Sequence, residues 1–414
     1  MKKLFTAIFS ITLLFIPIFG SCSTQIINES IRLASEQLIM DADSILKWNK
    51  QNDDIYSAKN LSKETLLAKI NAISIIPTSK RYIKISDGLY KEADPAYYSH
   101  LINNINFDVI ADTPDIRYGF ITKRTPLKTF PSKDEAFSST SSAHDRFLES
   151  TLYPFEPVAI LHESSDGEWI FIKMYNYEGW VLKDNVAETS IDVLRLYEDN
   201  DKFVVISVPK AFTSYSMTEL DMGCLFPLVN EHDNYYTVLC PKRDYNGKLC
   251  FSFGYISKQD ANIGYLQYTQ KNILIQAAKF INEPYGWGGM NGYRDCSALM
   301  MDIYRSMGIK LKRNTDQQEL MSPYSLNVRS LTKDEKENVL IKQLAGSLLF
   351  MDGHVMLYLG YIENKPYILH DVTGYYHEGI YVNANKVTVN DLYIENSQGS
   401  EYITLLSTFL LISE

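Results

Sequence analysis

The stretch that decides the fold is PYGWGGMNGYRDCSALMMDIYR, residues 284–305. Its first half is a glycine-rich loop, and its second half has the apolar spacing of an amphipathic helix. Asp295 is a natural N-cap, which places Cys296 at the first helical position. The unpaired backbone N–H groups and the positive dipole end at that position stabilise a thiolate and lower the pKa of the thiol. Cys296 is therefore a candidate nucleophile, although a cysteine standing alone there would be a buried structural thiol.

Two histidines downstream are candidates for the base that a nucleophilic cysteine needs. Residues 348–370 contain two apolar runs separated by the turn sequence ENKP, which predicts an antiparallel hairpin. His354 opens one strand and His370 closes the other. Antiparallel pairing makes them opposite or diagonal neighbours, so we expect their Cβ atoms about 5 to 8 Å apart. His354 would then take the thiol proton and protonate the leaving amine, and His370 would fix the imidazole tautomer. A zinc site is the alternative for these residues, although Cys296 has no second close ligand on its own element.

The quoted motifs carry a resemblance to the NlpC/p60 family of papain-like bacterial cell-wall peptidases over residues 269–414. Members share a Tyr-x-Trp-Gly-Gly loop, an Asp-Cys-Ser step into a helix, a His that opens a strand and a third polar residue on the next strand. All four occur here in that order. The strings LxRNxxxQ (311–318) and GHxMLYLG (353–360) are similar to a subgroup with a helical amino-terminal segment and two SH3-like domains. The resemblance therefore covers nearly all of the mature chain.

The resemblance implies cofactor-free hydrolysis, without a metal, of the amide between the γ-carboxyl of D-glutamate and meso-diaminopimelate or lysine in peptidoglycan stem peptides. SH3-bearing relatives often require a free amino-terminal L-alanine, which implies recycling of muropeptide fragments. Asp295 and Ser297 would line the subsite for the alanine amine, and Tyr285 and Trp287 would wall it. Their ordinary roles would be helix capping and core packing. An Asn-Thr pair at 314–315 stands where related enzymes carry a substrate-binding Asp-Ser pair.

The rest of the chain divides into segments that differ in the spacing of their apolar residues. Apolar residues follow helical spacing over 30–48 and 62–75, and short β-like runs separated by turns cover 117–186 and 203–263. The predicted fold is α+β, with a papain-like catalytic domain preceded by two small SH3-like β-barrels and a helical amino-terminal segment. The expected divisions are a lipoprotein signal peptide at 1–22, the helical segment at 23–115, SH3-like domains at 116–190 and 191–264, and the catalytic domain at 265–414.

The first residues predict export. A lysine pair at 2–3, an apolar run over 4–19 and Gly-Ser-Cys at 20–22 form a signal sequence that resembles the lipobox of bacterial lipoproteins. This resemblance implies that Cys22 is lipidated and that the protein is anchored at the periplasmic face of the outer membrane. A plain signal peptide that contains a cysteine is the alternative. No other stretch has the 18 or so apolar residues of a membrane span, so the anchor is the expected membrane contact.

Composition and cysteine spacing narrow the picture further. The chain has 414 residues and a net charge of −10, so it exceeds one domain core and lacks the basic surface that nucleic acid binding requires. Cys240 and Cys250 flank the turn 245–248, where a disulfide or two small buried hydrophobic side chains are both possible. Two rival functions remain open: amidase or acyl-transfer chemistry on another substrate, and a noncatalytic wall-binding lipoprotein.

Overall fold

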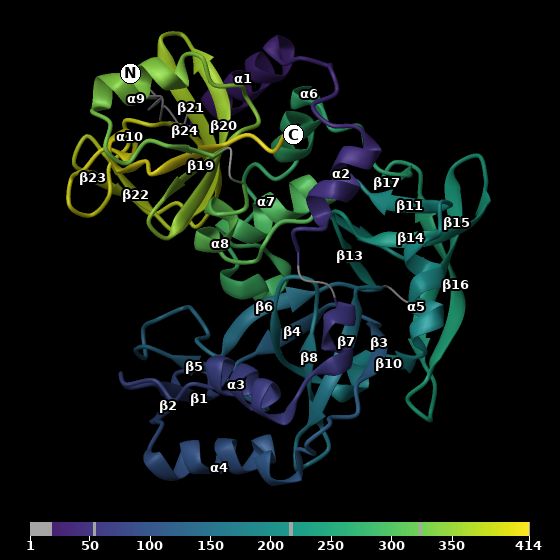
Figure 1. Ribbon diagram of the computed structural model, residues 1–414. Coiled ribbons are helices and arrows are strands. Elements are labelled where there is room, and N and C mark those ends of the chain that lie inside the picture. Colours follow the sequence, from purple (N-terminus) through teal and green to yellow (C-terminus); the bar gives the residue numbers. More distant parts are fainter. Residues whose placement is uncertain (1–18, 53–54, 215–217, 323–324, 414) are drawn as a thin grey trace, which may run out of the picture.

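The structure is a computed structural model that describes residues 19–52, 55–214, 218–322 and 325–413. Most of the predicted signal peptide and the side chain of Cys22 lie outside the described residues. Figure 1 shows three groups of strands around the central helix α7 (Cys296–Arg305): the carboxy-terminal strands at the upper left, β3 to β10 below, and β11 to β17 at the right. No helix in the described ranges is long and apolar enough to span a bilayer.

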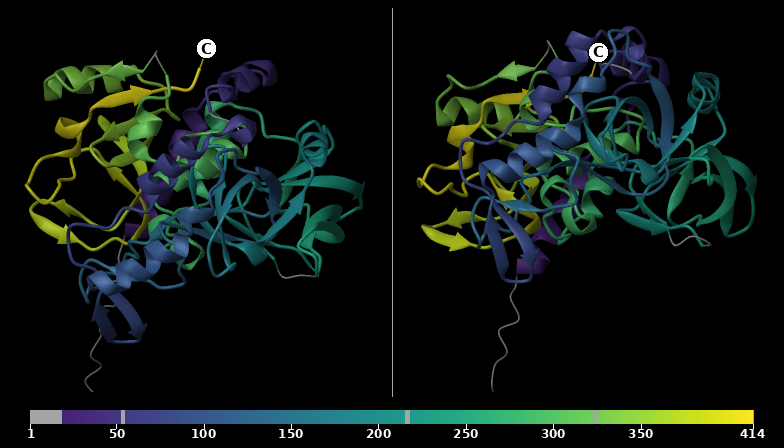
Figure 2. Two further views of the ribbon diagram at one scale, coloured as in Figure 1. Left: turned by 60° about the horizontal axis from the view of Figure 1, so that its bottom comes forward. Right: turned by 90° about the horizontal axis from the view of Figure 1, so that it is seen from below.

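The amino-terminal helices do not form a separate unit. Helix α1 packs against the carboxy-terminal region, with Ile26 and Ile27 buried there and the Ser30 hydroxyl donating to the Leu359 carbonyl at 2.7 Å. Helix α2 also packs on that region, where Trp48 is buried, whereas α3 packs against β9 of the β3–β10 group (Figure 2). The helical elements are α1 (Phe19–Leu33), α2 (Ala42–Asn49), η1 (Ile55–Asn60), α3 (Lys63–Ile73), α4 (Pro95–Ile105) and η2 (Phe107–Val109).

Two expectations for this segment need correction. The helical spacing over 30–48 does not give one helix, because the chain is extended around Leu38, which pairs with Thr269. A new helix begins only where the Asp41 carboxylate accepts from the backbone N–H of Ser44. The segment is also not wholly helical: β1 (Tyr82–Ser86) and β2 (Leu89–Glu92) form a hairpin that extends onto β5. The helix predicted over 62–75 is confirmed, with Ser62 as its N-cap.

The two middle groups of strands are antiparallel, as expected for SH3-like modules. The first is a seven-stranded sheet in the order β10-β3-β7-β8-β9-β4-β6, and its strands lie within 117–189. The second has the order β16-β15-β14-β11-β17, with β12 and β13 paired separately. The bounds in the first group are β3 (Arg117–Ile121), β4 (Thr125–Lys128), β5 (Ala136–Phe137), β6 (Leu148–Leu152), β7 (Pro157–Glu163), β8 (Trp169–Lys173), β9 (Glu178–Leu182), η3 (Lys183–Asn185) and β10 (Val186–Thr189).

The second group holds the cysteine pair on its longest hairpin. Strand register places Cys240 opposite Ser252 and Cys250 opposite Lys242, so the two cysteines are not direct neighbours, and both are free thiols. Cys240 is buried and Cys250 is exposed. The bounds are α5 (Ile191–Glu198), β11 (Phe203–Ile206), β12 (Lys210–Phe212), β13 (Glu219–Asp221), β14 (Leu225–Glu231), β15 (Tyr235–Arg243), β16 (Leu249–Ser257) and β17 (Ala261–Ile263).

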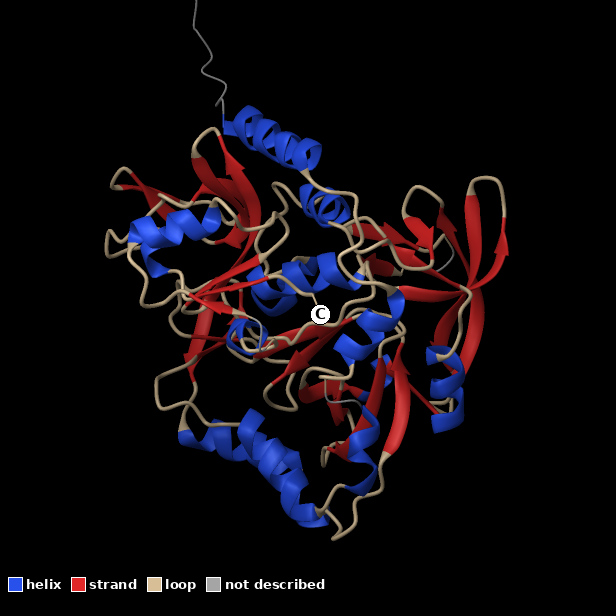
Figure 3. Ribbon diagram, turned by 45° about the horizontal axis from the view of Figure 1, so that its top comes forward, coloured by secondary structure: helices blue, strands red, loops and turns tan. Residues whose placement is uncertain are grey.

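The carboxy-terminal region is a six-stranded sheet, in the order β18-β25-β19-β20-β21-β24, between two layers of helices (Figure 3). Alternate residues of β20 face opposite sides: Val355 and Leu357 pack with α6 and α7, whereas Met356 packs with α9 and α10. The bounds are α6 (Gln270–Ala278), η4 (Trp287–Gly292), α8 (Thr315–Glu319), β18 (Leu326–Asn327), α9 (Lys333–Leu340), β19 (Leu348–Met351), β20 (His354–Ile362), β21 (Lys365–Val372), β22 (Tyr375–His377), β23 (Ile380–Val382), β24 (Lys386–Asp391), α10 (Tyr402–Leu405) and β25 (Thr408–Leu410).

Candidate active site

The glycine-rich loop delivers Cys296 to the start of α7, as the sequence predicts. Gly288 and Gly289 have φ values of 59° and 97°, which side-chain-bearing residues rarely adopt. A Cβ atom at Gly289 would also lie 2.0 Å from the Thr151 hydroxyl. After the loop, the Asp295 carboxylate accepts from the backbone N–H of Ala298 at 3.0 Å and caps the helix. The loop therefore needs glycine both for its turn and for close contact with the first SH3-like sheet.

The surroundings of the Cys296 thiol differ from the expectation of a low pKa. Burial, reinforced by the negative charge of Asp295, raises the pKa of Cys296 to about 11. The backbone N–H of Val355 and the hydroxyl of Thr315, whose oxygen lies 3.9 Å from the sulfur, act in the opposite direction but do not prevail. The resting nucleophile is therefore a neutral thiol, and attack requires a base that removes its proton.

The predicted histidine pair is confirmed in its geometry and continues to a third residue. His354 Nε2 lies 2.9 Å from His370 Nδ1, and His370 Nε2 lies 3.1 Å from Asn390 Oδ1. Because an amide oxygen only accepts, His370 donates from Nε2 and its Nδ1 accepts from His354. The relay leaves Nδ1 of His354 with a free lone pair. The backbone N–H of Val355, the residue after His354, contacts the Cys296 sulfur, so the thiol lies at the start of the strand that carries His354.

The protonation states suit a base. Burial, with a further contribution from the charge of His370, lowers the pKa of His354 well below its usual value. Burial lowers the pKa of His370 to about 4, although its hydrogen bond to Asn390 works against this. Both imidazoles are therefore neutral near pH 7, so His354 can accept a proton there.

We expect this shift to set the acid limb of the pH profile. A base whose pKa is depressed stays neutral as the pH falls, so kcat/KM should be unchanged between pH 7 and 6.5 and decline only below. The measurement is kcat/KM against pH for the purified protein, with far-UV circular dichroism at each pH as a control for folding. An acid limb with its midpoint at or above 6.5 in a folded protein would contradict the assignment of a neutral buried pair.

Two of the residues predicted to bind substrate, Asp295 and Ser297, form a buried cluster with Arg313. Both oxygens of Asp295 accept from the Arg313 guanidinium, at 2.6 and 3.2 Å, and one accepts from the Gly288 N–H. Burial opposes ionisation, but the ion pair with Arg313 keeps the pKa of Asp295 below its usual value. The Ser297 hydroxyl donates to Asp295 and accepts from Arg313. In the structure Asp295 and Ser297 therefore order the start of α7, and Arg313 is a site residue to which the sequence assigned no role.

The loop between β5 and β6, in the first SH3-like group, contacts the aromatic residues of the site. The His144 ring stacks on Trp287 with centroids 5.1 Å apart and lies 5.8 Å from the ring of Tyr285. The Arg146 guanidinium carbon lies 4.7 Å from the centre of the Trp287 ring. The predicted wall residues Tyr285 and Trp287 thus contact residues from another part of the chain. Stacking by His144 and the cation–π contact of Arg146 hold the two parts together.

A second contact with this group lies next to Asp295. Arg313 donates through Nε to the Ser150 hydroxyl at 2.7 Å. On the same strand, Glu149 accepts from the Tyr177 hydroxyl at 2.5 Å, and Tyr177 also interacts with Asn314 and Arg313. These contacts place an acidic side chain of the SH3-like sheet near the Cys296 end of the site. Sequence spacing could not show this, because the residues are over 100 positions apart.

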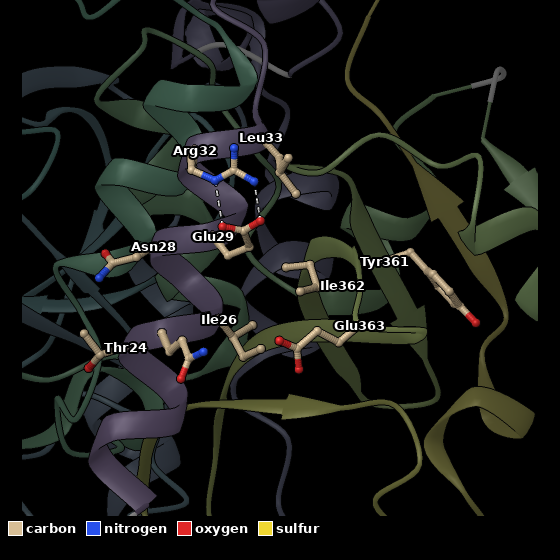
Figure 4. Close-up of a pocket in the computed structure, with 10 residues that line it drawn as sticks. Thr24, Ile26, Asn28, Glu29, Arg32, Leu33, Tyr361, Ile362 and Glu363 are labelled. Atoms are coloured by element: carbon tan, nitrogen blue, oxygen red, sulfur yellow. Dashed lines mark hydrogen bonds and ion pairs between the residues drawn. The ribbon is translucent and has the colours of Figure 1, made fainter.

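A large hollow lies away from these residues. It has a volume of about 990 Å³ and is lined by residues of α1 between Thr24 and Leu33 and by the tip of the β20–β21 hairpin (Figure 4). Neither Cys296 nor either histidine lines it. Among the described residues no group of three or more His, Cys, Asp and Glu side chains has the arrangement of a metal site. We therefore assign the reaction to Cys296 and the two histidines and not to this hollow.

Comparison with known proteins agrees with this geometry. Residues 282–404 match the model of the NlpC/P60 family, and residues 133–182 match an SH3 domain of the SH3b1 type. The chain therefore joins an NlpC/P60 domain, of a peptidase family, to an SH3b domain. The second predicted SH3-like domain, at 191–264, stays a prediction. The match to the SH3b1 model falls within the first SH3-like group, which contacts the site.

Relatives and solved structures extend the comparison. A γ-D-glutamyl-L-lysine dipeptidyl-peptidase of Bacillus subtilis is 25% identical over 60% of this chain and 74% of its own. Dipeptidyl-peptidase 6 of Lysinibacillus sphaericus is also 25% identical, over 60% of this chain and 85% of its own. An NlpC/P60 endopeptidase of Photobacterium damselae superimposes with a TM-score of 0.76 at 17% identity, covering 93% of this chain and 97% of its own. The fold of nearly the whole chain is thus shared with an NlpC/P60 protein.

Proposed function

We propose that this protein is a cysteine endopeptidase that hydrolyses the bond between the γ-carboxyl of D-glutamate and a diamino acid, diaminopimelate or lysine, in peptidoglycan stem peptides. The observation that carries the proposal is the relay from Asn390 through His370 to His354, at the start of the strand whose Val355 N–H contacts Cys296 at the start of α7. The names of the relatives from Bacillus subtilis and Lysinibacillus sphaericus, both dipeptidyl-peptidases, support the reaction class. The contacts of the first SH3-like group with the site support small muropeptide fragments as substrates.

The chemistry follows from the relay. His354 Nδ1 takes the proton of the Cys296 thiol as sulfur attacks the γ-carbonyl, and the carbonyl oxygen becomes an oxyanion. The unpaired backbone N–H groups at the first turn of α7 are placed to donate to that oxyanion. The protonated His354 then gives its proton to the leaving amine, and a water, deprotonated by the same imidazole, hydrolyses the thioester. His370 and Asn390 keep the His354 ring oriented throughout.

Glu149 is the carboxylate that we propose receives a free amino-terminal alanine. Arg313 and backbone N–H groups occupy both oxygens of Asp295, whereas the described residues show only the Tyr177 hydroxyl on Glu149. A charge-assisted contact shielded from water is worth roughly 1.5 to 3 kcal/mol, or about one to two orders of magnitude in binding. Acetylating the alanine removes its charge and adds bulk against the wall of the cleft.

We therefore expect free L-Ala-γ-D-Glu-diaminopimelate to be cleaved at least about tenfold more efficiently than its N-acetylated form. Glu149→Gln should reduce this ratio mainly through KM for the free peptide. Asp295→Asn should instead slow both peptides alike, because it loosens the Arg313 pair and the helix cap. The test is kcat/KM for both peptides with the three proteins. Equal values for the two peptides with the wild-type protein would refute recognition of the free amine.

The proposed cellular setting rests on the amino-terminal sequence. We propose that Cys22 is lipidated and that the exported protein is held in the periplasm, on the outer membrane, where released muropeptides are within reach. Cys22 lies within α1, four residues before the buried Ile26, so the anchor would lie about 6 Å along the helix from the packed core. Radiolabelled palmitate incorporated into the wild-type protein and not into Cys22→Ala would support the anchor, and equal labelling would exclude it.

A further inference from the structure

The glycine-rich loop is held from behind by a buried ion cluster. Arg294, directly before the N-cap Asp295, is fully buried. Its guanidinium donates to Asp302 and Glu283 of the carboxy-terminal region. It also donates to two acceptors of the second SH3-like group: the Pro209 carbonyl, at 2.7 Å, and the Asp221 carboxylate, at 2.8 Å. One residue next to the nucleophile thus carries contacts to two parts of the molecule.

Asp221 is the centre of this cluster. Its side chain has no solvent exposure. One oxygen accepts from Arg294 and from Lys210, the latter at 2.6 Å, and the other accepts from Arg124 at 3.2 Å. Arg124 belongs to the first SH3-like group, Lys210 to the second and Arg294 to the catalytic loop. A single carboxylate therefore balances three cations from three regions of the chain.

Arg124 provides a second set of contacts to the loop. It donates to the carbonyl of Gly289 at 2.8 Å and to that of Tyr293 at 3.2 Å. The loop has left-handed backbone at its glycines, and its β-bridges join only its ends, at Pro284, Tyr285 and Arg294, so the contacts of Arg124 help to fix the path of the part between them. Asp221 accepts hydrogen bonds from both Arg124 and Arg294. Arg124 contacts the loop and Arg294 belongs to it, within seven residues of Cys296.

We propose, on the basis of the proposed function, that Asp221 is a positioning residue for Cys296: the second SH3-like group sets the geometry of the catalytic loop through this buried carboxylate. Without the negative charge, the buried Arg294 and the partly buried Arg124 and Lys210 lose their common partner and repel one another. Arg294 and Arg124 would then separate and carry the loop with them. A displacement of about 1 Å at a nucleophile costs on the order of 100-fold in rate.

The test compares Asp221→Asn with Glu156→Gln. Glu156 pairs with Arg305 at 3.0 Å, at the opposite end of α7, so it also joins an SH3-like group to the catalytic region but does not touch the loop. Both variants should melt at lower temperature than the wild type. At a temperature where all are folded, Asp221→Asn should lose at least about tenfold in kcat with little change in KM, and Glu156→Gln should keep the wild-type kcat.

A second readout does not depend on the substrate. The rate of Cys296 alkylation by iodoacetamide, followed by peptide mass spectrometry, should change at least about threefold in Asp221→Asn and stay constant in Glu156→Gln. If wild-type protein fails to cleave the γ-D-glutamyl peptide, the proposed function falls while this arm still tests Asp221. Wild-type kcat and alkylation rate in folded Asp221→Asn would overturn the proposal. Should that variant not fold, Arg124→Gln, which removes the loop contacts at a partly exposed residue, takes its place under the same criteria.

Discussion

Cys296→Ala is expected to abolish hydrolysis of the stem peptide, by a factor of at least about 10⁴ in kcat, because no other group on the protein can form the thioester. The substitution removes one sulfur atom at the surface of the core, so the melting temperature should hardly change. The measurement is turnover of L-Ala-γ-D-Glu-diaminopimelate by the purified variant, with circular dichroism to show that it is folded.

The control for this experiment is a metal chelator. If Cys296 acts as a nucleophile, EDTA should leave wild-type turnover unchanged, whereas a zinc site built from the cysteine and the histidines would lose activity and regain it on addition of zinc. Wild-type turnover in Cys296→Ala, or recovery of a chelated protein with zinc, would contradict the thiol mechanism.

His354→Ala should be as damaging as the loss of the thiol, since the thiol has a pKa of about 11 and cannot ionise near pH 7 without a base. His370→Gln should keep part of the activity, because an amide oxygen can still accept from His354 Nε2. Asn390→Leu should fall between wild type and His370→Gln, as it frees the tautomer of His370 but leaves its ring in place.

Turnover of these variants, each checked for folding, tests the role assigned to each residue of the relay. If His370→Gln is as inactive as His354→Ala, the two histidines have the opposite roles or the orienting partner is different. If Asn390→Leu turns over like the wild type, then Asn390 does not fix the tautomer. Either result would leave the Cys296 assignment intact, because the first experiment tests it separately.

The local parts of the site could be predicted from sequence. Asp295 as N-cap, Cys296 at the first helical position and the hairpin that brings His354 to His370 all follow from spacing over a few residues. The break near Leu38 could not be predicted, because extended pairing with Thr269 overrides helical periodicity there. The register that separates Cys240 from Cys250 was also missed, since a turn signal does not fix pairing to the residue.

The long-range parts could not be predicted for a related reason. Arg313 meets Asp295 across 18 positions and Ser150 across 163, and only the folded chain shows that one guanidinium serves both. The same holds for the low-dielectric surroundings of Cys296: the helix start argues for a low pKa, but burial and the Asp295 charge outweigh it. Position in a helix is visible in a sequence, whereas desolvation is a property of the packed molecule.

The measurement that tests the central claim most directly is mass spectrometry of the products formed from L-Ala-γ-D-Glu-meso-diaminopimelate by the signal-free protein in the presence of EDTA. The account predicts two products, the dipeptide L-Ala-D-Glu and free diaminopimelate, and neither in a parallel incubation with Cys296→Ala. Intact tripeptide after prolonged incubation with folded wild-type protein, or release of free alanine by cleavage of the other amide, would contradict it.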